Sequence, residues 1–177
     1  MPKKPSEAHI PESLFELGMG NVVVARFKGS GEVECGMFLV DVWCLGVKNA
    51  MYKRLHPGQY QEMLDDMEQQ APLKQISVSC ARKLVTEAVS YSSRLGFKPH
   101  LDFKKAWRVM GGIDPGECDS SYTFGHDGKP HYFQGPHDTL AFSNKVVKTL
   151  TKILGSDNFY YTIAGGEDLS DFFAEER

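Results

Sequence analysis

The most apolar run of the chain, residues 37–47, carries a carboxylate at its centre. Asp41 lies between two valines, in a pattern typical of a strand that is covered on both faces. A buried carboxylate is costly unless it is hydrogen-bonded, protonated or paired with a cation. We therefore expect Asp41 to be buried. We also expect it to contact at least two backbone donors or a cation such as Arg26 or Lys48.

Length and composition favour one globular domain over residues 1–177, with residues 1–10 and 165–177 as peripheral tails. The apolar share of 41% and the charged share of 24% are ordinary for a folded protein, which excludes wholesale disorder. The net charge of -3 counts against a protein that coats nucleic acid. No apolar run is long enough to span a membrane, so we expect no membrane partner.

Hydrophobic periodicity and turn residues predict two β-hairpins and several helices. The first hairpin joins strands 22–27 and 33–45 through a glycine-containing loop, and the second spans 121–133 around Asp127 and Gly128. Strands without regular helix alternation indicate the α+β class: a mainly antiparallel sheet built from two β-hairpins and packed by three to four helices. The predicted helices are 60–70, 78–95, 103–110 and 138–154 with Asp138 as cap, beside a turn at 12–17 and a last strand at 158–164.

Asp41, Lys48 and Cys44 are the candidate catalytic residues. A carboxylate on a core strand can act as general base or metal ligand, with Lys48 or Arg26 beside it. A cysteine becomes a nucleophile only when a base or a positive environment lowers its pKa. The structural alternatives are an aspartate that is hydrogen-bonded in the core and a cysteine that serves as a small apolar side chain.

Three histidines, His126, His131 and His137, lie near Asp127 and Asp138 and could form a metal set. A hairpin turn and a helix cap already explain the two aspartates. We therefore expect no metal site, no cofactor and no tightly bound zinc.

The second hairpin and the last helix present the candidate binding residues. One hairpin face mixes rings and cationic groups, and lysines recur along one side of the predicted helix 138–154. Rings supply contact area and charges supply orientation, so these groups suit recognition of a partner. The alternative is that the aromatic residues pack under the helix as core. The candidate binding residues are His126, Lys129, His131, Lys145, Lys148 and Lys152, with Tyr122, Phe124 and Phe133 on the same hairpin face.

The cysteines are scattered and predict free thiols. Cys35, Cys44, Cys80 and Cys118 include no pair at the spacing of a zinc knuckle. The N-terminus lacks the apolar stretch of a secretory signal. Free thiols fit a reducing compartment, so we expect a cytoplasmic location.

Three segments carry a resemblance to a known family: Val24–Arg26, Phe38–Lys48 with the pattern FLVDxxCLGVK, and Gly96–Asp102. Together they are similar to a family of small uncharacterised bacterial proteins that has no assigned activity. The resemblance implies a bacterial cytosolic origin. It also implies that the segment from Asp41 to Lys48 is a family feature, and it brings no catalytic residues.

Two functions follow from these observations. The first is an interaction module that recognises a protein or nucleic-acid partner through the second hairpin and the last helix. The second is a hydrolase or nuclease centred on Asp41. The direction in which Asp41 points distinguishes them: a cleft with titratable neighbours favours the enzyme, and a sealed, hydrogen-bonded carboxylate favours the module.

Overall fold

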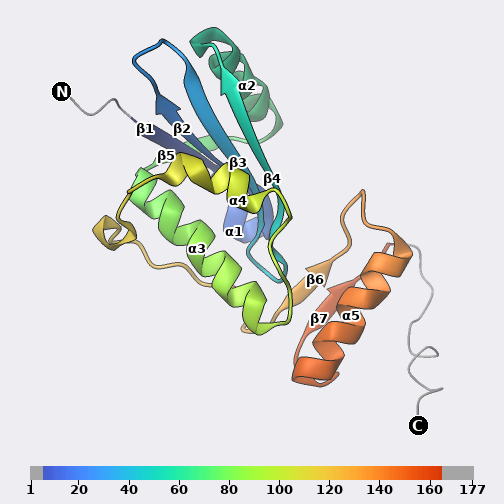
Figure 1. Ribbon diagram of the computed structural model, residues 1–177. Helices are drawn as coiled ribbons and strands as arrows, with labels where there is room; N and C mark the ends of the chain where they lie inside the picture. The colour runs from blue at the N-terminus through green and yellow to red at the C-terminus, as the bar shows by residue number, and fades with distance from the viewer. Residues whose placement is uncertain (1–5, 165–177) are drawn as a thin grey trace.

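The computed structural model describes residues 6–164, and the expected tail at 165–177 lies outside them. A five-stranded sheet, antiparallel throughout, forms the body of the molecule (Figure 1). With its helices, this sheet confirms the predicted α+β class. In sheet order the strands are β4 (Gly46–Leu55), β3 (Val33–Asp41), β2 (Met19–Phe27), β1 (Ser6–Pro11) and β5 (Leu73–Ile76).

Helices cover both faces of the sheet, as the apolar residues on both faces of β3 predict. Alternate residues of β2 and β3, such as Val23 and Cys35, pack against α2 (Pro57–Gln70). Their neighbours, such as Val24 and Phe38, pack against α3 (Val78–Arg94) and α4 (Phe103–Trp107). The remaining short helices are α1 (Leu14–Leu17), η1 (Arg108–Met110) and η2 (Pro115–Glu117). Within residues 6–164, no helix has the length and apolar character needed to cross a membrane.

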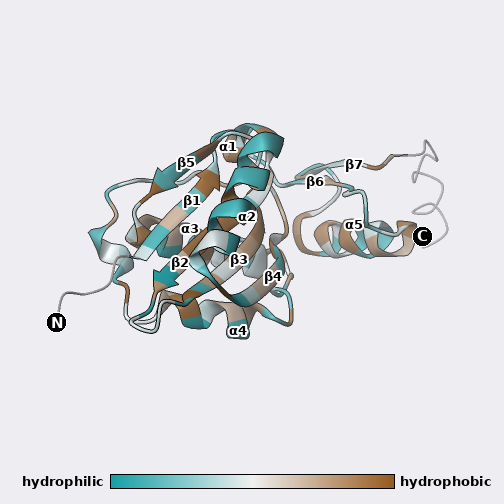
Figure 2. Ribbon diagram, turned by 90° about the horizontal axis from the view of Figure 1, so that it is seen from above, coloured by the Kyte–Doolittle hydropathy of each residue, from teal (hydrophilic) through white to brown (hydrophobic). Residues whose placement is uncertain are grey.

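A smaller C-terminal unit packs beside the end of the sheet where β3 turns into β4 (Figures 1 and 2). It consists of β6 (His131–Phe133), α5 (Leu140–Leu154) and β7 (Tyr160–Thr162). Tyr132 of β6 is buried beneath α5, in a cluster that also contains Cys44 and Leu45. This cluster joins the C-terminal unit to the body of the protein.

The structure corrects the expected second hairpin. Of the span 121–133, only one isolated bridge, His126 to Lys129, and strand β6 are regular. β6 pairs with β7, and the pairing is parallel. Gly125 donates instead to the carbonyl of Val42, so the segment follows the body of the protein before it reaches β6.

The sequence did not predict three of the strands, β1, β4 and β5. The expected tail at 1–10 is wrong for residues 6–10, because β1 pairs with β2 on one side and β5 on the other. β4 was missed because its second half is exposed or half-buried throughout and carries the charged residues Lys53 and Arg54, so it shows no apolar face. The four residues of β5 are too few to show a period.

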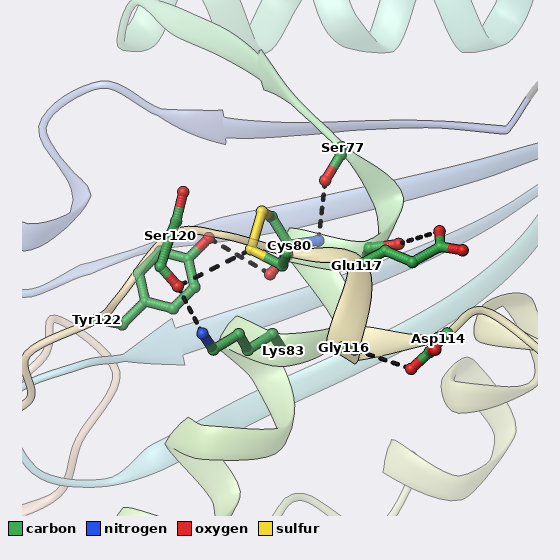
Figure 3. The surroundings of a disulfide bond; sticks show 10 residues. Ser77, Cys80, Lys83, Asp114, Gly116, Glu117, Ser120 and Tyr122 are labelled. Carbon is green, nitrogen blue, oxygen red and sulfur yellow. Dashed lines mark hydrogen bonds between the residues drawn. A yellow bond between two sulfur atoms is a disulfide. The ribbon is translucent and has the colours of Figure 1, made fainter.

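Two further expectations are wrong. Asp138 does not cap α5; Thr139 is the N-cap and accepts a hydrogen bond from the backbone of Phe142. Cys80 and Cys118 are not free thiols but form a disulfide between the first turn of α3 and the residue after η2 (Figure 3). Cys35 and Cys44 are free, and both are buried.

Candidate functional site

The turn that joins β3 to β4 is built around Asp41. Its Oδ1 accepts hydrogen bonds from the backbone N–H groups of Trp43 and Cys44, each at 3.0 Å, and its Oδ2 accepts one from Leu45 at 3.1 Å. Gly46 ends the turn at φ 67°, where a Cβ would collide with Ser92 and approach the carbonyl oxygen of Ala88 to 2.8 Å. The carboxylate therefore does for this turn what capping side chains do at helix ends.

Asp41 is only 3% exposed, which confirms the prediction of a buried carboxylate with at least two backbone donors. Burial raises the pKa of Asp41 to about 6, although the three backbone donors and the charge of Lys48 offset part of that effect. Both oxygens are occupied by the turn and shielded from solvent. This arrangement fixes the backbone rather than presenting a base to a substrate.

Lys48 is paired with Asp138, not with Asp41. Its Nζ lies 3.0 Å and 3.1 Å from the two carboxylate oxygens of Asp138, and the two side chains are 12% and 11% exposed. Burial alone would raise the pKa of Asp138, but the Gly135 N–H, Lys48 and the hydroxyl of Tyr132 outweigh it and lower that pKa. The pair links β4 to the segment before α5. Arg26, the other cation considered for Asp41, donates to the carbonyl of Val109.

Cys44 is fully buried among the side chains that join α5 to the body. Burial raises the pKa of its thiol, and the charge of Asp41 raises it further. A thiol that stays protonated at neutral pH is a poor nucleophile. Cys44 therefore acts as a small apolar side chain in this cluster.

A patch of rings lies just outside the same turn. The indole of Trp43 stacks on His126 and His131, with centroid distances of 4.2 Å and 5.4 Å. His131 also contacts the rings of Phe133 and Tyr160, and the Nζ of Lys129 lies 5.3 Å from the centre of the Tyr160 ring. We call the side chains of Trp43, His126, Lys129, His131, Phe133 and Tyr160 the aromatic face.

The aromatic face is both accessible and rigid. Phe133 is 52% exposed and Tyr160 43% exposed. Trp43 is fixed because its Nε1 donates to the carbonyl of Phe15 at 3.3 Å, and its ring leaves no room for a side chain at Gly18. His131 is held between Thr162 and His126, at 2.9 Å from Thr162 Oγ1 and 3.4 Å between the two Nδ1 atoms.

The surroundings of His131 favour its neutral form. Burial and the neighbouring charge of His126 lower the pKa of His131, opposed by Asp127. The face therefore combines stacked rings, among them a His131 imidazole whose neutral form is favoured, with the side chain of Lys129 at its edge.

The structure does not bring all the candidate binding residues together. α5 packs on the inner side of β6, where Tyr132 lies, while the neighbouring His131 and Phe133 point to the outer side. Lys145, Lys148 and Lys152 lie on the side of α5 opposite its buried residues. The lysine stripe and the aromatic face therefore lie on opposite sides of the C-terminal unit. Tyr122 and Phe124 separate as well, and pack on Phe15 and Tyr91 of the body.

Sequence reasoning missed Trp43 and Tyr160 as members of the face. Trp43 lies within the apolar run, where a ring is most simply explained as a core side chain. Tyr160 reaches His131 only through the parallel pairing of β6 with β7, for which the sequence carries no signal.

The residues between 6 and 164 include no group of three or more histidine, cysteine or acidic side chains that could hold a metal ion. The absence of bound zinc stays a prediction, which metal analysis of protein purified without a histidine tag can test. Comparisons of the chain with models of protein families, with curated proteins and with solved structures find no match. The function must therefore be argued from the geometry of the chain itself.

The raised pKa of Asp41 predicts an unusual pH dependence. Between pH of about 4 and about 6 the unfolded chain has lost the proton that folded Asp41 still holds, so the contribution of this group to stability falls as pH rises. Asp41→Asn cannot ionise and lacks this slope. From pH 4 to pH 6 we expect the wild type to lose stability relative to Asp41→Asn by on the order of 1 kcal/mol per pH unit. Urea unfolding at several pH values measures the difference, and a slope of opposite sign would show that folding lowers this pKa.

Proposed function

We propose that this protein is a non-enzymatic interaction module, which recognises a protein or nucleic-acid partner through the aromatic face. The observation that carries the proposal is the half-exposed stack of Trp43, His126 and His131, continued by the exposed rings of Phe133 and Tyr160. Aromatic side chains that are rigid and half exposed lose little entropy on binding and dominate the energetics of many interfaces.

The chemistry of the face suits a partner with flat or apolar groups. Rings can stack on nucleobases or on the aromatic side chains of a protein, and Lys129 can pair with a phosphate or a carboxylate at the rim. The net charge of -3 favours a protein partner over a nucleic acid.

The alternative is a hydrolase or nuclease centred on Asp41. That function needs a carboxylate that reaches substrate, and the hydrogen bonds of Asp41 to its own turn count against it. The bacterial origin and the cytoplasmic location also stay proposals. The Cys80–Cys118 disulfide counts against a reducing compartment, because such bonds persist mainly in oxidising ones.

The double variant Phe133→Ser/Tyr160→Ser tests the proposal. Both side chains are exposed, so the melting temperature should not change, while retention of partners on the immobilised protein should fall about tenfold. Quantitative mass spectrometry of material captured from lysate, and anisotropy with a fluorescent oligothymidine, measure protein and nucleic-acid binding separately.

Met51→Ser is the matched control, because Met51 is also an exposed apolar side chain, at 41%, but lies on β4. It should leave both signals unchanged. Equal retention by the wild type and the double variant would remove the aromatic face as the binding surface.

A further inference from the structure

We infer that a cleft between the body and α5 binds a small organic anion that carries an apolar body. The cleft has a volume of about 380 Å³, within the range of ligand pockets in proteins. It shares no residue with the aromatic face, so this inference does not depend on the proposed function.

Three segments distant in sequence form the cleft. Leu45, Val47 and Lys48 come from the turn before β4 and the start of that strand, residues 96–100 from the link between α3 and α4, and residues 142–149 from α5. Gly96, at φ 90°, allows α5 to approach this link closely; a Cβ there would lie 2.6 Å from Ile153. A ligand in the cleft would therefore contact both the body and the C-terminal unit.

The charged groups that line the cleft are all basic. Lys98 comes from the link after α3 and Lys145 from α5, and both are exposed. Lys48 lies deeper, already held by Asp138. Among the described lining residues there is no aspartate or glutamate. Two lysines that face one cleft without a carboxylate between them repel each other, and an anion between them relieves that repulsion.

His100 also lines the cleft, and a hydrogen bond defines which of its ring nitrogens can donate. Its Nδ1 accepts a hydrogen bond from the backbone N–H of Asp102 at 3.1 Å, so in the neutral ring the proton is on Nε2. The backbone N–H of His100 donates to the carbonyl of Val47, which holds this residue against β4. The Nε2–H of His100 is thus a further hydrogen-bond donor among the lining residues, besides the ammonium groups.

The other residues that line the cleft would contact the apolar part of the ligand. Leu45, Val47 and Val146 line the cleft but are buried, so the carbon surface open to a ligand comes mainly from Phe97 and from Phe142, whose side chain is 40% exposed. Inorganic anions gain nothing from such surface. Each CH₂ group that it buries contributes roughly 0.8 kcal/mol, which favours an anion with a chain or a ring.

Calorimetric titration with octanoate and with octyl phosphate tests the inference. We expect both to bind, and both inorganic phosphate and octanol to bind at least about tenfold more weakly, because each lacks one half of the recognised chemistry. Octanol binding as tightly as octanoate would show that the lysines play no part. If inorganic phosphate bound as tightly as octyl phosphate, the apolar part of the ligand would contribute nothing and the proposal would be wrong.

Charge-reversal variants test whether the ligand binds in this cleft. Lys98→Glu/Lys145→Glu changes two exposed side chains and should weaken octanoate binding about tenfold, while Phe142→Ala should weaken octyl phosphate more than inorganic phosphate. Lys152→Glu is the matched control, since it lies on the same side of α5, about 10 Å further along and outside the cleft. No binding by the wild type, or equal loss in the control, would overturn the inference.

Discussion

Replacing Asp41 with alanine is expected to lower the free energy of unfolding by about 3 kcal/mol or more. The substitution leaves the backbone N–H groups of Trp43, Cys44 and Leu45 without their acceptor. Cys44 and Leu45 are buried, so water cannot replace the carboxylate there. The same turn contacts the C-terminal unit through Cys44 and Leu45, so the loss should spread to α5.

Urea unfolding of the wild type, Asp41→Ala and Asp41→Asn measures this effect. Asparagine keeps one acceptor oxygen and nearly the same volume, so its loss should fall between the other two. Because burial raises the pKa of Asp41 to about 6, the loss in Asp41→Ala should be larger at pH 4.5 than at pH 7.5. A loss below about 1 kcal/mol at both pH values would mean that the turn does not depend on this carboxylate.

The apolar run around Asp41 predicted more of the structure than any other segment. It predicted a central strand that is covered on both faces, the hairpin of that strand with β2, and hydrogen-bonding partners for Asp41. The chain turns at Asp41, however, four residues before the predicted end of the strand at Leu45. The run continues because Val42 and residues 44–47 are buried by α3 and the C-terminal unit, so apolar character alone cannot distinguish a strand from a buried turn.

The candidate site was only partly predictable. His126, Lys129 and His131 do lie together, because one bridge of the expected hairpin forms. The cleft beside α5 could not be anticipated, since Lys98 and Lys145 meet only through the packing of α5 against the link after α3. The pairing of Lys48 with Asp138 could not be predicted either, because the two residues are 90 positions apart and Asp138 resembled a helix cap.

The disulfide is the sharpest difference between expectation and structure, and its removal should have the other large effect. Cys80→Ser/Cys118→Ser is expected to lower the free energy of unfolding by about 4 kcal/mol, because the bond closes a loop with a sequence separation of 38 residues. The effect acts mainly on the unfolded chain. In the folded state other contacts still hold the loop to α3, including Lys83 Nζ to the Ser120 carbonyl at 2.6 Å and Arg82 to the Gly111 carbonyl at 2.7 Å (Figure 3 shows the former).

Reductant supplies the control for this second prediction. Adding it should lower the urea midpoint of the wild type towards that of the double variant, whose own midpoint should not move. Thiol titration of the denatured, unreduced wild type should find two free thiols, those of Cys35 and Cys44, out of the four cysteines. Four free thiols in protein prepared under oxidising conditions would contradict the bond. Two would confirm the bond between Cys80 and Cys118.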